Sequence, residues 1–252
     1  MKTVGVDIAG AKNTWMALID LDSQSNEFDE EYPKMQTLEE IVVYCLDPKN
    51  DVKNIVIDAP LSYAIDEENG MRDCELLLRE ALFCNGYKRE YVASSNSLQG
   101  VAIRGYRLAE ELRQCGFNGD ILEIIPRYCL AQFATASGNS QLIQAIKSYK
   151  VLSKKDKQGN EIIDKSSVIL KRKWIWDEWR SFYFGAREDG FLLGKFEGSN
   201  QDGIIDAFIC ATIGYLLHNQ PSSLRLVPHK PNHPEKRRGF VAGIHVLGEG
   251  HF

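Results

Sequence analysis

Apolar and polar positions alternate at the start of the chain with the period of a β-strand. Residues 2–9 carry two sets of side chains that would lie on opposite faces of a strand: Val4, Val6 and Ile8, and Gly5, Asp7 and Ala9. A second apolar run follows at residues 14–21, and the segment GAKN between them has residues typical of a turn. The pattern predicts a two-stranded hairpin with one acid inside it, where a charge is costly unless it has a partner.

After the hairpin, short apolar runs alternate with segments of helical spacing. We expect strands at residues 54–60 and 120–126, and helices within 37–46, 70–86, 92–116, 139–184 and 199–218. The run at 54–60, NIVIDAP, is apolar on both faces, which is typical of a central parallel strand covered on both sides. A hairpin followed by strands that alternate with helices predicts an α/β fold, with a mixed sheet flanked by helices.

Length and composition narrow the class of protein. The 252 residues fit one domain, with a helical and partly basic insertion at about 139–184 and a tail from about 221 that ends in a short predicted strand. The sequence has no signal-peptide pattern and no apolar run long enough to span a membrane. The six cysteines are scattered, without CxxC or zinc-ligand spacing, so we expect reduced cysteines in a cytoplasmic protein with no membrane partner.

Acidic residues recur in segments that are otherwise apolar. They are Asp7 in the first strand, Asp58 at the end of VIDAP, Glu123 in ILEIIP, Asp206 in the small-residue helix DAFICATIG, and Asp202 one helical turn earlier. The structural alternatives are a turn cap for Asp58, a buried pair with an arginine for Asp206, a helix cap for Asp202 and a solvent-facing strand position for Glu123. If they converge on one end of the sheet, however, a divalent cation is needed between them. Oxygen ligands without histidine or cysteine favour Mg²⁺ or Mn²⁺.

Five pieces of the chain resemble the domain of unknown function 429 family, which is described as predicted nucleases of the ribonuclease H-like fold. The pieces are GVDIAGAK, IDAPLS, RDCELLLR, EIIPR and DAFICA, in the family's order from residue 5 to residue 211. The closing Asp-Ala helix is similar to that of Holliday-junction resolvases. The resemblance implies a ribonuclease H-like sheet with metal ligands at Asp7, Asp58 and Asp206.

We hypothesise that the chain hydrolyses phosphodiester bonds with two Mg²⁺ or Mn²⁺ ions, which Asp7 would bridge. The catalytic candidates are Asp7, Asp58, Glu123 and Asp206, and Asp202 is a further candidate metal ligand. The candidates for substrate binding are Lys12, Arg72, Glu75, Arg79 and Arg127. Arg72, Glu75 and Arg79 would share one helix face, where they clamp a phosphate, pair with the acids or form exposed ion pairs.

A basic stretch at residues 147–173 predicts contact with nucleic acid, either DNA or RNA. It has nine basic and three acidic residues, a net charge of +6 in a chain whose net charge is −5. Trp174, Trp176 and Trp179 follow it, and would stack on bases if they are exposed. A solvated helix face with core tryptophans is the alternative. A second basic cluster lies at residues 236–238.

Two other classes of function stay open. The segment DIAGAK also looks like the first phosphate loop of actin-like ATP-dependent small-molecule kinases, although the chain is short for two such halves and has no glycine-rich adenosine motif. A phosphate-binding enzyme of that fold is a related alternative, and an inactive scaffold that binds nucleic acid is another. The sequence leaves the oligomeric state open, a homodimer included.

Overall fold

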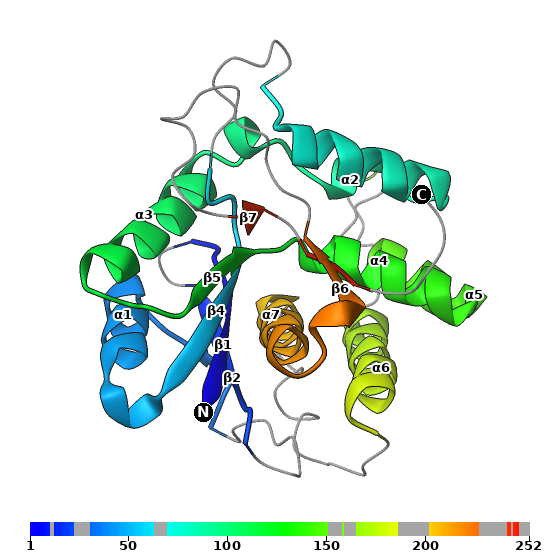
Figure 1. The fold of residues 1–252 in the computed structure, drawn as a ribbon. Helices are drawn as coiled ribbons and strands as arrows, with labels where there is room; N and C mark the ends of the chain where they lie inside the picture. The colour runs from blue at the N-terminus through cyan, green and yellow to red at the C-terminus, as the bar shows by residue number, and fades with distance from the viewer. Residues whose placement is uncertain are drawn as a thin grey trace.

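A six-stranded mixed sheet forms the centre of the chain in a computed structural model, with strand order β3-β2-β1-β4-β5-β7 (Figure 1). The structure describes residues 1–10, 13–22, 31–62, 70–150, 158, 165–185, 202–226, 241–242 and 244–246. The strands of the sheet are β1 (Lys2–Asp7), β2 (Trp15–Asp20), β3 (Lys34–Met35), β4 (Val52–Asp58), β5 (Asp120–Glu123) and β7 (Val241–Ala242). Two further strands, β6 (Leu224–Leu226) and β8 (Ile244–Val246), form a small second sheet.

The predicted hairpin is confirmed. Strands β1 and β2 pair antiparallel, with Lys2 opposite Asp20 and Asp7 opposite Trp15. Along β1, the side chains of Val4 and Val6 pack into the layer that contains helices α1 (Leu38–Leu46) and α3 (Gly100–Gln114). The opposite face of β1 lies against helix α7 (Asp202–Asn219). The alternation in the sequence therefore separates two hydrophobic layers, one on each side of the sheet.

The remaining strands of the sheet run parallel to β1. Strand β4 pairs with β1 on one side and with β5 on the other, and β5 pairs with β7. The prediction that residues 54–60 form a central parallel strand is thus confirmed. Because parallel strands end at the same edge of a sheet, the carboxyl ends of β1, β4 and β5 lie together.

Helices cover both faces of the sheet, as the alternation of strands and helices predicts (Figure 1). Helices α1 and α3 share one hydrophobic cluster with the sheet, and Thr37 caps α1 in a capping box with Glu40. The other face packs against α7, which is followed outward by α2 (Asp73–Cys84), α4 (Pro126–Ser137), α5 (Ser140–Ser148) and α6 (Lys165–Phe184). The α/β class and the mixed sheet are therefore both observed.

Helix α7 packs unusually close to β1, and a glycine in the strand makes this possible. A Cβ atom at Gly5 would overlap the carbonyl oxygen of Ala207 and the backbone of Ala211. The missing side chain of Gly5 therefore makes room for the helix. This contact brings the start of α7 to the carboxyl end of β1.

Two further expectations from composition can be compared with the structure. All six cysteines are free of disulfides, and four of them, Cys45, Cys74, Cys129 and Cys210, are buried. Among the helices in the described ranges, none has the length and apolar character that a membrane span requires. The predicted helical segment 139–184 contains α5 and α6, and its residues 151–157 and 159–164 lie outside the described residues.

Candidate metal centre

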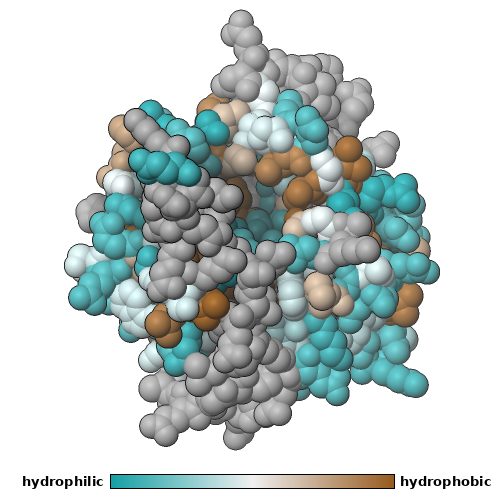
Figure 2. Space-filling view, turned by 180° about the vertical axis from the view of Figure 1, so that it is seen from behind, coloured by the Kyte–Doolittle hydropathy of each residue, from teal (hydrophilic) through white to brown (hydrophobic). Residues whose placement is uncertain are grey.

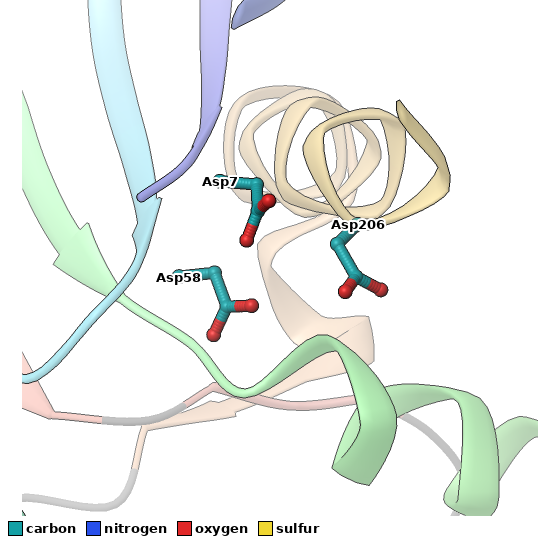
Figure 3. A group of neighbouring side chains, drawn as sticks. All are labelled: Asp7, Asp58 and Asp206. Carbon is teal, nitrogen blue, oxygen red and sulfur yellow. The ribbon is translucent and has the colours of Figure 1, made fainter. Parts of the chain in front are cut away.

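Three aspartates from distant parts of the chain meet at the carboxyl edge of the sheet (Figure 3). Asp7 is the last residue of β1, Asp58 is the last residue of β4, and the two lie opposite each other in the parallel register. Asp206 reaches the same place from the second turn of α7. Each residue offers a carboxylate oxygen, and these three oxygens lie within 4.8 Å of one another. The convergence that the sequence predicts for Asp7, Asp58 and Asp206 is therefore present.

The start of α7 is fitted tightly to this group of acids. A Cβ atom at Gly203 would lie 2.5 Å from Oδ2 of Asp7 and would overlap the indole ring of Trp15. A larger residue there would push the first turn of α7 away from β1. The N-terminal end of a helix carries a partial positive charge, which favours carboxylates beside it.

Burial and mutual repulsion raise the pKa values of the three aspartates. Burial raises the pKa of Asp7 well above its ordinary value, and the charges of Asp58 and Asp206 raise it further. Burial raises the pKa of Asp58 to about 7, although the charge of Lys150 opposes the shift. Burial also raises the pKa of Asp206, again against Lys150. A bound cation would relieve this repulsion, so the electrostatics favour a metal ion.

Asp206 differs from the other two aspartates because Tyr149 and Lys150, which directly follow α5, contact its two carboxylate oxygens. The ammonium of Lys150 lies 2.5 Å from Oδ2, and the hydroxyl of Tyr149 donates a hydrogen bond to Oδ1 over 3.0 Å. Arg172, which is fully buried, donates from Nε to the carbonyl oxygen of Tyr149 over 2.8 Å. The sequence analysis missed Tyr149 and counted Lys150 only as part of the basic stretch.

The three aspartates line a cleft of about 310 Å³. Asp202 and Lys150 also line it, and its other walls include the apolar residues Ala59, Leu98, Val101 and Ile125. The face of the molecule opposite to that in Figure 1 is hollowed near its middle, with hydrophilic residues at the bottom and hydrophobic ones along one side (Figure 2). Asp202 thus lies at the cleft, as proposed from its spacing, but it is not one of the three residues whose oxygens converge.

Glu123 is held by an arginine, one of the alternatives that the sequence left open for Arg72. It is buried at the end of β5, and the guanidinium of Arg72 contacts both of its oxygens, at 2.8 Å and 2.5 Å. The backbone N–H of Leu61 donates to Oε2 as well, over 2.8 Å. Glu123 borders the cleft, but its carboxylate is occupied by protein donors and is not one of the three converging acids. This arrangement is that of a structural ion pair.

Arg72 and Glu75 belong to the same buried network, so the expected phosphate clamp is not supported. Arg72 precedes α2 and its Nε donates to Glu75, whose carboxylate also accepts from the backbone N–H groups of Arg72 and Ser95. An exposed face of ion pairs is wrong as well, because both side chains are 1% exposed. The remaining alternative, pairing with the acids, is observed for Arg72, whose guanidinium contacts two buried carboxylates, those of Glu75 and Glu123.

The other residues proposed to bind substrate are spread over several places. Arg79 donates from Nε to the carbonyl oxygen of Val92 and does not line the cleft. Arg127 does line it, with its guanidinium 3.5 Å from the centre of the Tyr91 ring and one nitrogen donating to the carbonyl of Lys147. Lys12 lies outside the described residues.

The tryptophans after the basic stretch are core residues, not an exposed stacking surface. Trp176 is 1% exposed and stacks on Phe208 of α7, and Trp179 is fully buried against Phe133. Trp174 is half-buried and donates from its indole to Glu178. Much of the basic stretch, together with the cluster at 236–238, falls outside the described residues.

No family model, no curated protein and no solved structure matches the chain. A function must therefore be assigned from the residues of the site. Three converging carboxylates in a cleft, with a lysine beside them, are suited to holding a hard divalent cation.

Proposed function

We propose that this chain is a divalent-metal-dependent nuclease of the ribonuclease H-like fold, which hydrolyses phosphodiester bonds in nucleic acid with Mg²⁺ or Mn²⁺. The observation that carries the proposal is the meeting of Asp7, Asp58 and Asp206 at one edge of the sheet. The resemblance to the domain of unknown function 429 family supports it, because its pieces GVDIAGAK, IDAPLS and DAFICA contain these three residues. An antiparallel hairpin continued by parallel strands is consistent with that fold.

The residues fit a hard cation in both chemistry and spacing. Mg²⁺ and Ca²⁺ bind oxygen at about 2.0–2.6 Å, so oxygens that share one ion lie within roughly 4–5 Å of each other. The three carboxylate oxygens lie within 4.8 Å of one another, slightly wider than the roughly 4.2 Å that bonds of about 2.1 Å to Mg²⁺ span, so small side-chain rotations would bring them onto one ion. A divalent ion held here would supply positive charge that activates a water molecule and stabilises the phosphate in the transition state.

The chain's own side chains have distinct parts in the reaction. Hydrolysis forms a bond between a water oxygen and phosphorus and breaks the bond to the sugar oxygen, while a proton leaves the water and one reaches the sugar oxygen. Asp7, Asp58 and Asp206 position the cation, and Lys150 adds a positive charge at the same cleft. The apolar walls, including Leu98 and Val101, limit the access of bulk water and strengthen these interactions.

The first test is cleavage of labelled single-stranded and structured DNA and RNA by the purified chain, with Mn²⁺ or Mg²⁺ and with a chelator. We expect metal-dependent cleavage that Asp7→Asn reduces by about 100-fold or more, because it weakens the cation site. Asp177→Asn is the matched control, since Asp177 is an exposed acid on α6 that forms only a surface pair with Lys173.

Full activity in the chelator, or in Asp7→Asn with an unchanged fold, would contradict the proposal. Stabilisation of the chain by ATP without any cleavage would instead favour the kinase. Metal-independent binding of nucleic acid without cleavage would favour the scaffold. These outcomes separate the three classes that the sequence leaves open.

A further inference from the structure

We propose that Lys150 supplies the second positive charge of the site, so that the chain works with one divalent ion and one ammonium group instead of two ions. This inference rests on the proposed function and refines it. It concerns a residue outside the acidic group, and it changes the two-ion expectation that follows from the sequence. The evidence is the set of contacts around Asp206 and the way in which Lys150 is held.

Asp206 is the aspartate that already has a cation. The Nζ atom of Lys150 lies 2.5 Å from Oδ2 of Asp206, and Tyr149 donates its hydroxyl proton to the other oxygen. Within the described part of the chain, neither Asp7 nor Asp58 forms an ion pair of this kind. The free carboxylate edges are therefore those of Asp7 and Asp58, which lie side by side across β1 and β4. A single ion bound between Asp7 and Asp58, with at most one oxygen of Asp206, leaves the ion pair of Lys150 with Asp206 intact.

Lys150 is held in position by buried residues instead of being a loose surface side chain. The residue before it, Tyr149, is fully buried, and Arg172 of α6 fixes its carbonyl oxygen with a 2.8 Å hydrogen bond. Nearby, Lys171 of α6 donates to the hydroxyl of Ser148. The Lys150 side chain itself is 29% exposed and lines the cleft, so its ammonium can contact both Asp206 and a phosphate. A charge held in advance stabilises a transition state without the cost of reorganisation.

Calorimetric titration with Mn²⁺ tests the stoichiometry directly. We expect the unmodified chain to bind one ion. In Lys150→Met, which removes the charge but keeps the length, the affinity for Mn²⁺ should rise by about tenfold, as when one opposing charge is removed from a carboxylate. Lys150→Arg should bind one ion with nearly unchanged affinity. Lys147→Met is the matched control, because the Lys147 ammonium lies over the Tyr87 ring and not in the cleft.

Cleavage is measured on the same variants. Lys150→Met should lose activity by about 100-fold, in the range seen when one group that stabilises transition-state charge is removed. Tighter metal binding combined with lower activity is a result that simple structural damage to the site does not produce. Lys150→Arg should retain much of the activity, since it keeps the positive charge.

Two bound ions in the unmodified chain would overturn the inference. So would unchanged Mn²⁺ affinity in Lys150→Met, or full cleavage by that variant, because the ammonium would then contribute no charge to the metal site or to the reaction. If Lys150→Met fails to fold in a thermal melt, the stoichiometry of the unmodified chain still decides. The proposed function fails in a different way, by absence of cleavage in the unmodified chain, and the metal titration would remain interpretable.

Discussion

At the scale of single residues, the chain uses buried carboxylates in two different ways. Asp7, Asp58 and Asp206 face one another, with Lys150 as their positive neighbour. Glu123, by contrast, is fully satisfied by Arg72 and the N–H of Leu61. Both oxygens of Asp206 also have protein partners, so the feature that indicates a binding site is the convergence of three carboxylates at the cleft.

Arg72→Met tests the structural role of this second group. It should destabilise the chain by about 3–5 kcal/mol, because it leaves the buried carboxylates of Glu75 and Glu123 uncompensated. The free energy of unfolding, measured with urea, gives the answer. Arg89→Met is a control, since Arg89 forms an exposed pair with Glu80. If Arg72→Met unfolds like the unmodified chain yet loses cleavage, Arg72 contacts substrate after all.

These residues also show which contacts of the site could be predicted from the sequence and which could not. Asp7 and Asp58 could be predicted to meet because parallel strands end at one edge of the sheet, and Asp206 because its helix is apolar enough to pack there. That Arg72 pairs with one of the acids was one alternative from the sequence, but its partner Glu123 could not be predicted, because 51 residues separate the two and no periodicity connects them. The same holds for Tyr149, which meets Asp206 across 57 residues.

At the scale of elements, the packing of α7 on β1 sets the site. Every residue of α7 from Gly203 to Leu216 is buried, so the helix is fixed by the core on all sides. Its small residues allow the close approach at Gly5, and its first turns carry Asp202 and Asp206 to the cleft. The helix and the strand therefore position Asp206 relative to Asp7 together.

Gly5→Ala tests this coupling of packing to the site. The added methyl group would overlap the backbone of Ala207 and Ala211, so we expect a loss of about 1–3 kcal/mol in the free energy of unfolding. Because Asp206 precedes Ala207 directly, the affinity for Mn²⁺ should fall as well. Chemical denaturation and metal titration measure the two effects. Gly100→Ala is the control, since a Cβ there meets nothing within 4 Å; equal behaviour of the two variants would refute the coupling.

The element boundaries were more predictable than the contacts between elements. The strand at 2–7, its partner at 15–20 and helix α1 follow from alternation, turn residues and the Thr37 cap. The burial of the tryptophans could not be predicted from the sequence, because the spacing of Trp176 and Trp179 fits either a buried or an exposed helix face. Only the position of α6 against α4 and α7 decides which face is buried.

At the scale of the whole molecule, the acidic centre affects stability as a function of pH. The pKa values of Asp7, Asp58 and Asp206 are raised in the folded chain, that of Asp58 from 3.8 to about 7. The folded state therefore holds protons that the unfolded state has lost between these values. Without metal, the stability that these groups contribute is complete below about pH 4 and is lost as the pH rises toward about 7.

Metal binding should reverse this loss, so the stabilisation by Mn²⁺ should depend on pH. We expect the rise in melting temperature caused by Mn²⁺ to be small near pH 5 and several degrees larger near pH 8, because protons compete with the ion for the carboxylates. Thermal melts with Mn²⁺ and with chelator over this range give the difference. Asp7→Asn serves as the reference without an intact site. A metal effect that is equal at all pH values would argue against binding at these aspartates.

The parallel register of β1 and β4 has a practical consequence for anyone who wishes to modify this chain. Asp7 and Asp58 lie directly opposite each other on adjacent strands, so the separation of their backbones follows the spacing between strands, about 4.8 Å, and not the path of any loop. Loops and walls around the cleft can thus be exchanged to alter which molecules enter, while the backbone spacing of these two aspartates stays unchanged.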